Sequence, residues 1–189
     1  MTITLIRHSI SLVSSRAPIT LWGLTDEGIK QAQALVDDPD ISSLDVLYSS
    51  LQTKALETAL ILAKPNAIPI RTHPGIREIT SFTNKYYDRD EYERLENDFY
   101  AEEIERIADG ETATEALNRF KAAIDEFRNL SMGMNRIGIV SHGNILSFYT
   151  ASLMNLQPYE VQGSIGMPDI AVLDYESGVI TRSWSGPHD

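Results

Sequence analysis

The chain of 189 residues contains no cysteine, which excludes disulfides and thiolate-bound metal ions. It also has no apolar run long enough to cross a membrane, and its N-terminus has no signal-peptide pattern. We therefore expect a cytoplasmic protein with no membrane partner. The length is typical of one domain with a proper hydrophobic core, so a single domain over residues 1–189 is predicted.

Positive charge is scarce as well: 16 Lys and Arg stand against 27 Asp and Glu, and the formal net charge is −11. A nucleic-acid-binding surface would be basic, so the sequence predicts no nucleic-acid partner. Four histidines without cysteine give little support for a zinc site, and we predict neither a metal nor a cofactor. The composition does not set the oligomeric state.

Two short apolar runs each end next to a histidine. Residues 3–6 are followed by Arg7 and His8, and residues 137–140 are followed by Ser141 and His142. Such runs predict buried strands, and open α/β sheets bind ligands at the carboxyl ends of their strands. Taken alone, Arg7 and His8 are better explained as a surface ion pair and an incidental loop histidine. Two imidazoles at one sheet edge, with Arg7 and Lys54 nearby, would instead suit a phosphate.

Apolar runs alternate with helical periodicity along most of the chain. Strands are expected near residues 2–8, 45–49, 68–72, 136–141, 170–175 and 179–184, the last two joined by a turn at 176–178. Helices are expected after Thr25, after Ser50, after the capping box that begins at Thr112, and from Asn144 to about Asn155. Residues 157–168 are expected to form a loop. The alternation predicts a three-layer α/β/α sandwich with a mostly parallel central sheet and an antiparallel edge.

Five short motifs, in this order, carry a resemblance to one family. They are Arg7-His8-Ser9, Leu24-Thr25-Asp26-Glu27-Gly28-Ile29-Lys30-Gln31-Ala32, Val46-Leu47-Tyr48-Ser49-Ser50, Ile76-Arg77-Glu78-Ile79 and Ser141-His142-Gly143-Asn144. The ordered set resembles the histidine phosphatase superfamily, also called phosphoglycerate mutase-like, over about residues 2–150. The resemblance implies the phosphoglycerate mutase-like fold and a metal-independent phosphatase.

The resemblance also implies roles for single residues. His8 would attack phosphorus and carry a phosphohistidine, Glu78 would donate and accept the proton, and Arg7 and His142 would stabilise charge. The residues expected to bind substrate are Lys54, Ser9, Arg16, Gly143 and Asn144. The substrate would be a small phosphorylated metabolite or a phosphorylated protein side chain.

Two positions depart from the family pattern. Lys54 stands where the family has an arginine, and a lysine holds phosphate as a point charge rather than as a two-pronged fork. Ser9 stands where the family has a glycine, and its hydroxyl could either add a donor or crowd the pocket. These departures are the support for one alternative, a non-catalytic phosphate-binding or regulatory relative. A second alternative is a cofactor-dependent phosphoglycerate mutase, which Asn144 after His142-Gly143 favours and Lys54 disfavours.

Residues 80–111 form an acidic, tyrosine-rich stretch where the family inserts a variable lid. We expect one or two helices over residues 89–107 with their aromatic side chains turned inward. Substrate choice is expected to depend on this segment, as it does on variable insertions generally. The alternative is a charged, solvated helix that touches no substrate.

Overall fold

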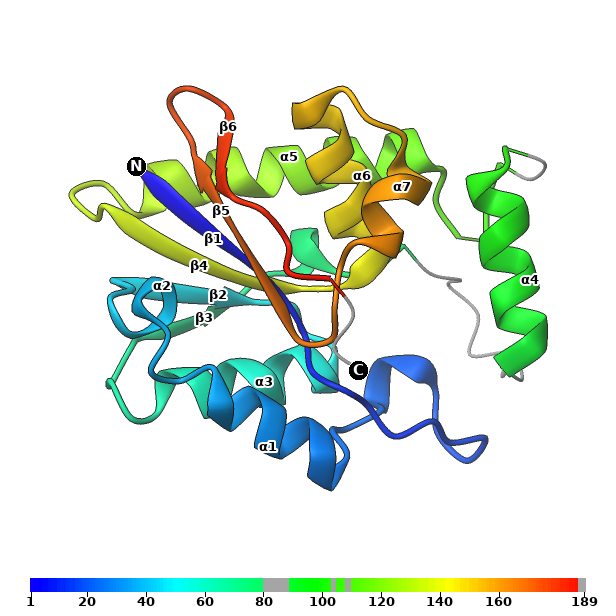
Figure 1. The fold of residues 1–189 in the computed structure, drawn as a ribbon, viewed down its shortest axis with the longest axis horizontal. Helices are drawn as coiled ribbons and strands as arrows, with labels where there is room; N and C mark the ends of the chain where they lie inside the picture. Colours follow the sequence, from blue (N-terminus) through cyan, green and yellow to red (C-terminus); the bar gives the residue numbers. More distant parts are fainter. Residues whose placement is uncertain (80–88, 103–104, 108–109, 187–189) are drawn as a thin grey trace.

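The fold is built on one six-stranded mixed sheet in the order β3-β2-β4-β1-β5-β6 (Figure 1). The computed structural model describes residues 1–79, 89–102, 105–107 and 110–186. The strands are β1 (Thr2–Arg7), β2 (Val46–Ser49), β3 (Ile70–Thr72), β4 (Arg136–Ser141), β5 (Asp169–Asp174) and β6 (Val179–Arg182). β1 to β4 pair in parallel, whereas β5 runs antiparallel to both β1 and β6. The predicted mostly parallel sheet with an antiparallel edge is confirmed.

Helices cover both faces of this sheet. α1 (Asp26–Ala34), α2 (Pro39–Ser42) and α3 (Thr53–Ala63) pack on one face, and α5 (Ala113–Leu130), α6 (Gly143–Met154) and α7 (Pro158–Gly163) lie on the other (Figure 1). Single 3-10 turns span Ile19–Leu21 and Pro74–Ile76. Each face has its own cluster of buried apolar side chains. The three-layer α/β/α sandwich is therefore confirmed.

Local signals place the helix starts as expected. The Thr25 side chain caps α1 by accepting a hydrogen bond from the Gly28 amide, and Thr112 forms a full capping box with Glu115 at the start of α5. The burial of residues 3–6 on both sides of β1 explains why that strand is a continuous apolar run.

The parallel pairing of β1 with β4 brings the two histidines together. Arg7 is in register with Ser141, so that His8 and His142 each follow at the same end of neighbouring strands. The expectation that two strands deliver their imidazoles to one sheet edge is confirmed.

The prediction was wrong for residues 157–168, which were expected to form a loop. The structure has α7 at Pro158–Gly163, with Pro158 in its first turn and Val161 buried against the core. Proline suits the first turn because that position needs no amide donor. Here a short buried contact stabilises a helix that has too few residues for a clear apolar period.

The segment at residues 80–111 contains α4 (Arg89–Tyr100), which lies beyond the carboxyl ends of the parallel strands, beside α6 and α7 (Figure 1). The helix ends at Tyr100, so helix up to residue 107 is not found, and residues 80–88, 103–104 and 108–109 are outside the described part. The inward aromatics are confirmed for Tyr92, Phe99 and Tyr100, which pack against the core or against Phe148 of α6. Within the described ranges, no helix is long and apolar enough to span a bilayer.

Candidate active site

His8 and His142 face each other at the carboxyl ends of β1 and β4. Their ring centroids lie 5.1 Å apart, and both side chains are buried. Nδ1 of His8 lies 2.7 Å from the Ser9 carbonyl oxygen. A carbonyl only accepts, so Nδ1 carries the proton and Nε2 of the neutral ring keeps its lone pair. Burial, together with the charges of Lys54 and Arg7, holds the pKa of His8 well below its usual value, which keeps this ring neutral.

One ring nitrogen of His142 has no hydrogen-bond partner within the described part of the chain. Its Nε2 lies 2.9 Å from Ser50 Oγ, while Nδ1 is buried without a hydrogen-bond partner among the described residues. Burial, followed by the neighbouring His8, Lys54 and Arg7, lowers the pKa of His142 well below its usual value. A buried polar atom without a partner is costly, so Nδ1 is a nitrogen that a bound group could satisfy.

Arg7 presents a second unpartnered nitrogen to the same place. Its Nη1 donates to the carbonyl oxygens of Ile165 at 2.8 Å and Gly166 at 3.4 Å. Its Nε is buried and has no partner in the ranges that the structure describes. Gly143 lets the guanidinium lie there, because a Cβ at this position would be 3.0 Å from Arg7 Cζ. Burial lowers the pKa of Arg7, yet a guanidinium stays charged at neutral pH.

Asp169 at the start of β5 holds the loop that orients Arg7. Its carboxylate accepts hydrogen bonds from the Gly166 amide at 2.9 Å and from Ser185 Oγ at 2.8 Å, and it is almost fully buried. The Ile165 carbonyl, which receives the Arg7 guanidinium, lies next to Gly166. The sequence analysis did not find Asp169, since nothing near it in the chain connects this residue with Arg7.

Lys54 lies at the start of α3 and is 6% exposed, so it does not face solvent. Its Nζ is 5.8 Å from the centroid of the Trp22 ring, a cation–π contact with the loop that follows His8. Burial lowers the pKa of Lys54 to about 8, with Glu78 and Glu96 raising it and Arg7 lowering it further. These mutual effects show that Lys54 lies close to the other charged groups of the site.

Glu78 is a buried carboxylate at the edge of the same cluster. Its Oε1 accepts from the amides of Ile79 and Ile145, each at 2.9 Å, and its Oε2 accepts from the Asn144 amide at 3.1 Å. Burial raises the pKa of Glu78, while these amides and Lys54 oppose the rise. A carboxyl whose pKa is raised keeps its proton to higher pH than an ordinary glutamate, which suits a general acid. The Asn144 and Ile145 amides at the start of α6 thus bind the Glu78 carboxylate.

Asn144 connects Glu78 with the lid helix α4. Its Nδ2 donates to Glu96 Oε1 at 2.6 Å, and its Oδ1 accepts from the Tyr100 hydroxyl at 2.9 Å. The Tyr100 hydroxyl also lies 2.7 Å from Ser147 Oγ. Glu96 and Tyr100 were not among the predicted site residues. Their spacing could have found them, because Tyr92, Glu96 and Tyr100 are four residues apart and lie on one face of the helix.

Ser9 and Arg16, both predicted to bind substrate, have other described contacts. The Ser9 hydroxyl donates to the Gly28 carbonyl at 2.6 Å, and the Ser9 amide donates to Thr58 Oγ1 at 3.1 Å. Its φ is not positive, so the position accepts a side chain. Arg16 is exposed in the loop after β1, where its amide donates to Ser14 Oγ. Contact of either residue with a substrate stays a prediction.

A second buried ion cluster supports the segment that carries Glu78. Arg119 of α5 binds both oxygens of the buried Glu111 carboxylate, and Arg77 donates to the same carboxylate at 3.0 Å. Arg119 also donates to the carbonyls of Gly75 and Arg77 at 2.7 and 3.1 Å. The residues just before Glu78 are therefore fixed to α5 by charge-assisted hydrogen bonds. Among the described residues, no group of three or more His, Asp or Glu could hold a metal ion.

The fold and this cluster of two neutral imidazoles, two buried cations and a buried carboxyl define a phosphate-type anion site at a sheet edge. The sequence model of the histidine phosphatase superfamily (branch 1) matches residues 3–182. The chain belongs to this superfamily, which confirms the family that the five motifs indicated.

Solved structures with the same fold are similar to nearly the whole chain. YhfR of Bacillus stearothermophilus has a TM-score of 0.79 and 20% identity, over 100% of this chain and 98% of that one. A phosphoserine phosphatase of Entamoeba histolytica, in complex with 3-phosphoglyceric acid, has a TM-score of 0.76 and 22% identity, over 97% of this chain and 95% of that one. An alpha-ribazole phosphatase of Shigella flexneri has a TM-score of 0.73 and 20% identity, over 100% of this chain and 99% of that one. The comparison with curated protein sequences gives no significant match.

Proposed function

We propose that the protein is a phosphatase that hydrolyses a phosphate monoester through a phosphohistidine on His8. The observation that carries the proposal is a pair of buried nitrogens, Arg7 Nε and His142 Nδ1, that lack partners among the residues described, together with the lone pair on Nε2 of nearby His8. Lys54 adds a second cation to the same place. A tetrahedral dianion next to the nucleophile would satisfy these donors together.

The proposed reaction has two steps that use the same groups. In the first, His8 Nε2 attacks phosphorus, the bond to the ester oxygen breaks, and protonated Glu78 gives its proton to the leaving alkoxide. In the second, Glu78 takes a proton from a water molecule, whose oxygen attacks phosphorus. The phosphorus–nitrogen bond breaks, its electron pair returns to Nε2, and phosphate is released. Arg7 and Lys54 neutralise the phosphoryl oxygens in both steps, and the neutral His142 ring contributes a hydrogen bond from Nδ1.

The charge needed for this reaction can come entirely from side chains, which supports metal independence as part of the proposal. Two of the structural neighbours are named as phosphatases of small phosphorylated compounds, phosphoserine and alpha-ribazole phosphate, which favours a small substrate here as well. A non-catalytic relative would need the anion site but neither the free Nε2 of His8 nor the buried acid Glu78. A cytoplasmic location and a single domain over residues 1–189 stay predictions.

Hydrolysis of p-nitrophenyl phosphate, with EDTA present, tests the proposal. Wild type should be active and His8→Ala inactive, because the mutant has no nucleophile. p-Nitrophenolate leaves without a proton, so Glu78→Gln should still form the phosphoenzyme but release it slowly. A burst of p-nitrophenol and the mass of one added phosphoryl group on the His8 peptide are the expected readouts.

Two results would contradict the proposal. Undiminished hydrolysis by purified His8→Ala would exclude the nucleophile, and loss of wild-type activity in EDTA that is restored by a divalent metal would exclude metal independence.

A further inference from the structure

Glu96 of α4 brings a second carboxylate to the proposed active site. Its Oε1 accepts a hydrogen bond from the Asn144 side chain, and the Asn144 backbone amide donates to Glu78. Asn144 therefore bridges the carboxyl groups of Glu96 and Glu78. Glu96 is close enough to Arg7 and Lys54 to raise the pKa of each. The acidic lid therefore touches the site, and the alternative of a solvated helix away from any substrate does not apply to this face of α4.

The Asn144 contact alone does not explain a carboxylate at this position. Nδ2 of Asn144 needs an acceptor, and the neutral amide oxygen of a glutamine would serve it. A charged carboxylate in a partly buried place is costly unless a positive group pairs with it. Among the described residues, the Glu96 carboxylate has no Lys or Arg nitrogen within ion-pair distance. Burial raises the pKa of Glu96, while the hydrogen bond from Asn144 and the charge of Arg7 oppose the rise and favour the ionised carboxylate.

A count of charges around a bound phosphate monoester shows the same imbalance. The dianion is balanced by Arg7 and Lys54, the two histidines are neutral, and Glu78 is protonated when it acts as the acid. Among the described residues, the negative charge of Glu96 then remains without a counterion in the site. Glu96 lies next to Glu78, which must reach the ester oxygen, so the uncompensated charge lies on the side of the leaving alcohol.

We propose that Glu96 binds a positively charged group on the leaving alcohol, and that the substrates are phosphate monoesters of small amino alcohols. This inference rests on the proposed phosphatase function and names its substrate class. The ammonium donates to Glu96 and completes the charge balance, and the Tyr100 hydroxyl holds Asn144 and hence Glu96 in place. The same carboxylate repels alcohols that carry a carboxylate or a second phosphate, which disfavours phosphoglycerates and so the mutase alternative.

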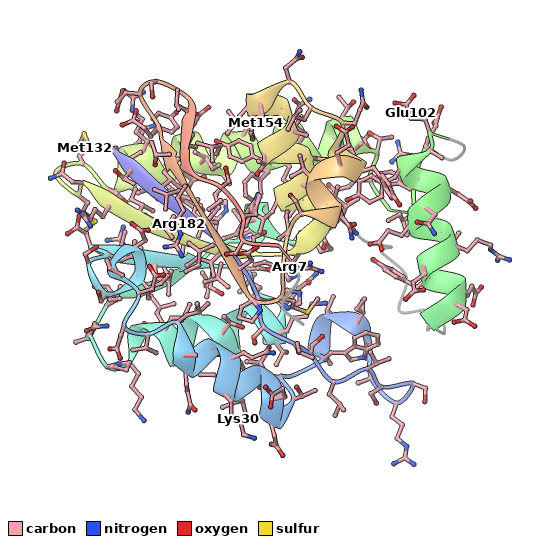
Figure 2. The ribbon with its side chains drawn as sticks, in the orientation of Figure 1. Arg7, Lys30, Glu102, Met132, Met154 and Arg182 are labelled. Atoms are coloured by element: carbon pink, nitrogen blue, oxygen red, sulfur yellow. The ribbon has the colours of Figure 1, made fainter. Side chains whose placement is uncertain are left out.

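Three phosphate esters of similar length test which chemical group on the leaving alcohol the site prefers. Phosphoethanolamine carries an ammonium, 2-hydroxyethyl phosphate a neutral donor and propyl phosphate a methyl group. We expect wild-type kcat/KM for phosphoethanolamine to exceed that for propyl phosphate about tenfold, the scale of one charge-assisted hydrogen bond. Glu96→Gln should reduce this ratio about tenfold. Glu102→Gln is the matched control, since Glu102 is exposed just beyond the end of α4 and should leave the ratio unchanged (Figure 2).

Binding to His8→Ala, measured by calorimetry with phosphoethanolamine and propyl phosphate, tests the inference without turnover. Tighter binding of phosphoethanolamine that is lost in His8→Ala/Glu96→Gln supports it, even if wild type hydrolyses no ester and the phosphatase proposal fails. The inference is overturned if wild type prefers 2-hydroxyethyl or propyl phosphate, or if the ratio survives Glu96→Gln. It is also overturned if hydrolysis depends on His8 but 3-phosphoglycerate is a better substrate than phosphoethanolamine.

Discussion

Activity should fall above pH 8 because Lys54 loses its charge there. Burial in the α3 start lowers the pKa of this ammonium to about 8. The lysine is the group that replaces a family arginine, and only its charged form can neutralise a phosphoryl oxygen. At pH 9 roughly one Lys54 in eleven keeps its proton, so kcat/KM should drop about tenfold between pH 7 and pH 9.

The pH profile of kcat/KM for p-nitrophenyl phosphate measures this effect. kcat/KM reports the pKa of the free enzyme, whereas kcat reports the enzyme–substrate complex. Bound phosphate stabilises the ammonium, so the fall in kcat should begin at higher pH than the fall in kcat/KM. Lys54→Arg should remove the fall near pH 8, because a guanidinium keeps its proton there. Lys30→Arg is the matched control, since Lys30 is exposed on α1 (Figure 2).

Deprotonation of Lys54 at high pH should lower the activity but raise the free energy of unfolding. The pKa of Lys54 is about 8 in the folded protein, against 10.5 for an ordinary lysine, so the unfolded chain binds more protons between these values. The contribution of Lys54 to the free energy of unfolding therefore rises from pH 8 to pH 10.5, by at most about 3 kcal/mol. Denaturant unfolding of wild type relative to Lys54→Met, which has no proton to lose, measures this contribution.

These opposite signs make the reasoning refutable. A loss of activity that came from unfolding would be accompanied by lower stability, whereas loss of the Lys54 charge would not. A wild-type kcat/KM that is flat from pH 7 to pH 10 would refute the role of Lys54. The same holds for a Lys54→Arg variant with an unchanged alkaline fall.

Two further predictions concern the supports of the site. Gly143→Ala places a methyl group 3.0 Å from the Arg7 guanidinium, so it should lower the free energy of unfolding by about 1–3 kcal/mol and clearly reduce kcat/KM. The control Gly163→Ala has nothing within 4 Å of the added methyl group and should change neither quantity. Equal effects of the two variants would contradict this prediction. Glu111→Gln weakens the ion pairs with Arg77 and Arg119 and should lower the free energy of unfolding, measured in urea, by about 2 kcal/mol. Glu160→Gln, at an exposed position, is the control and should cause no change. An unchanged urea midpoint for Glu111→Gln would show that this cluster does not hold the segment before Glu78.

The sequence by itself determined the sheet and the pair of histidines. Strands that are buried on both faces read as apolar runs, and helices with one buried face show a 3.6-residue period, so both signals lie within a few residues of the element they form. His8 and His142 directly follow such runs, and parallel pairing must bring them to one edge. The capping residues Thr25 and Thr112 could be predicted from sequence as well, because a helix cap joins residues only three positions apart.

Only the tertiary structure decided which polar side chains meet. Glu96 resembles any other acid of the lid in sequence, and its place beside Asn144 depends on how α4 packs on α6 through Tyr100 and Phe148. The Ser9 hydroxyl could have entered the pocket, but the packing of α1 turned it to the Gly28 carbonyl. These contacts join residues far apart in the chain, and a residue's neighbours in sequence carry no signal of them. The sequence therefore specified the strand that carries His8, whereas the packing of α4 placed the Glu96 carboxylate beside Asn144.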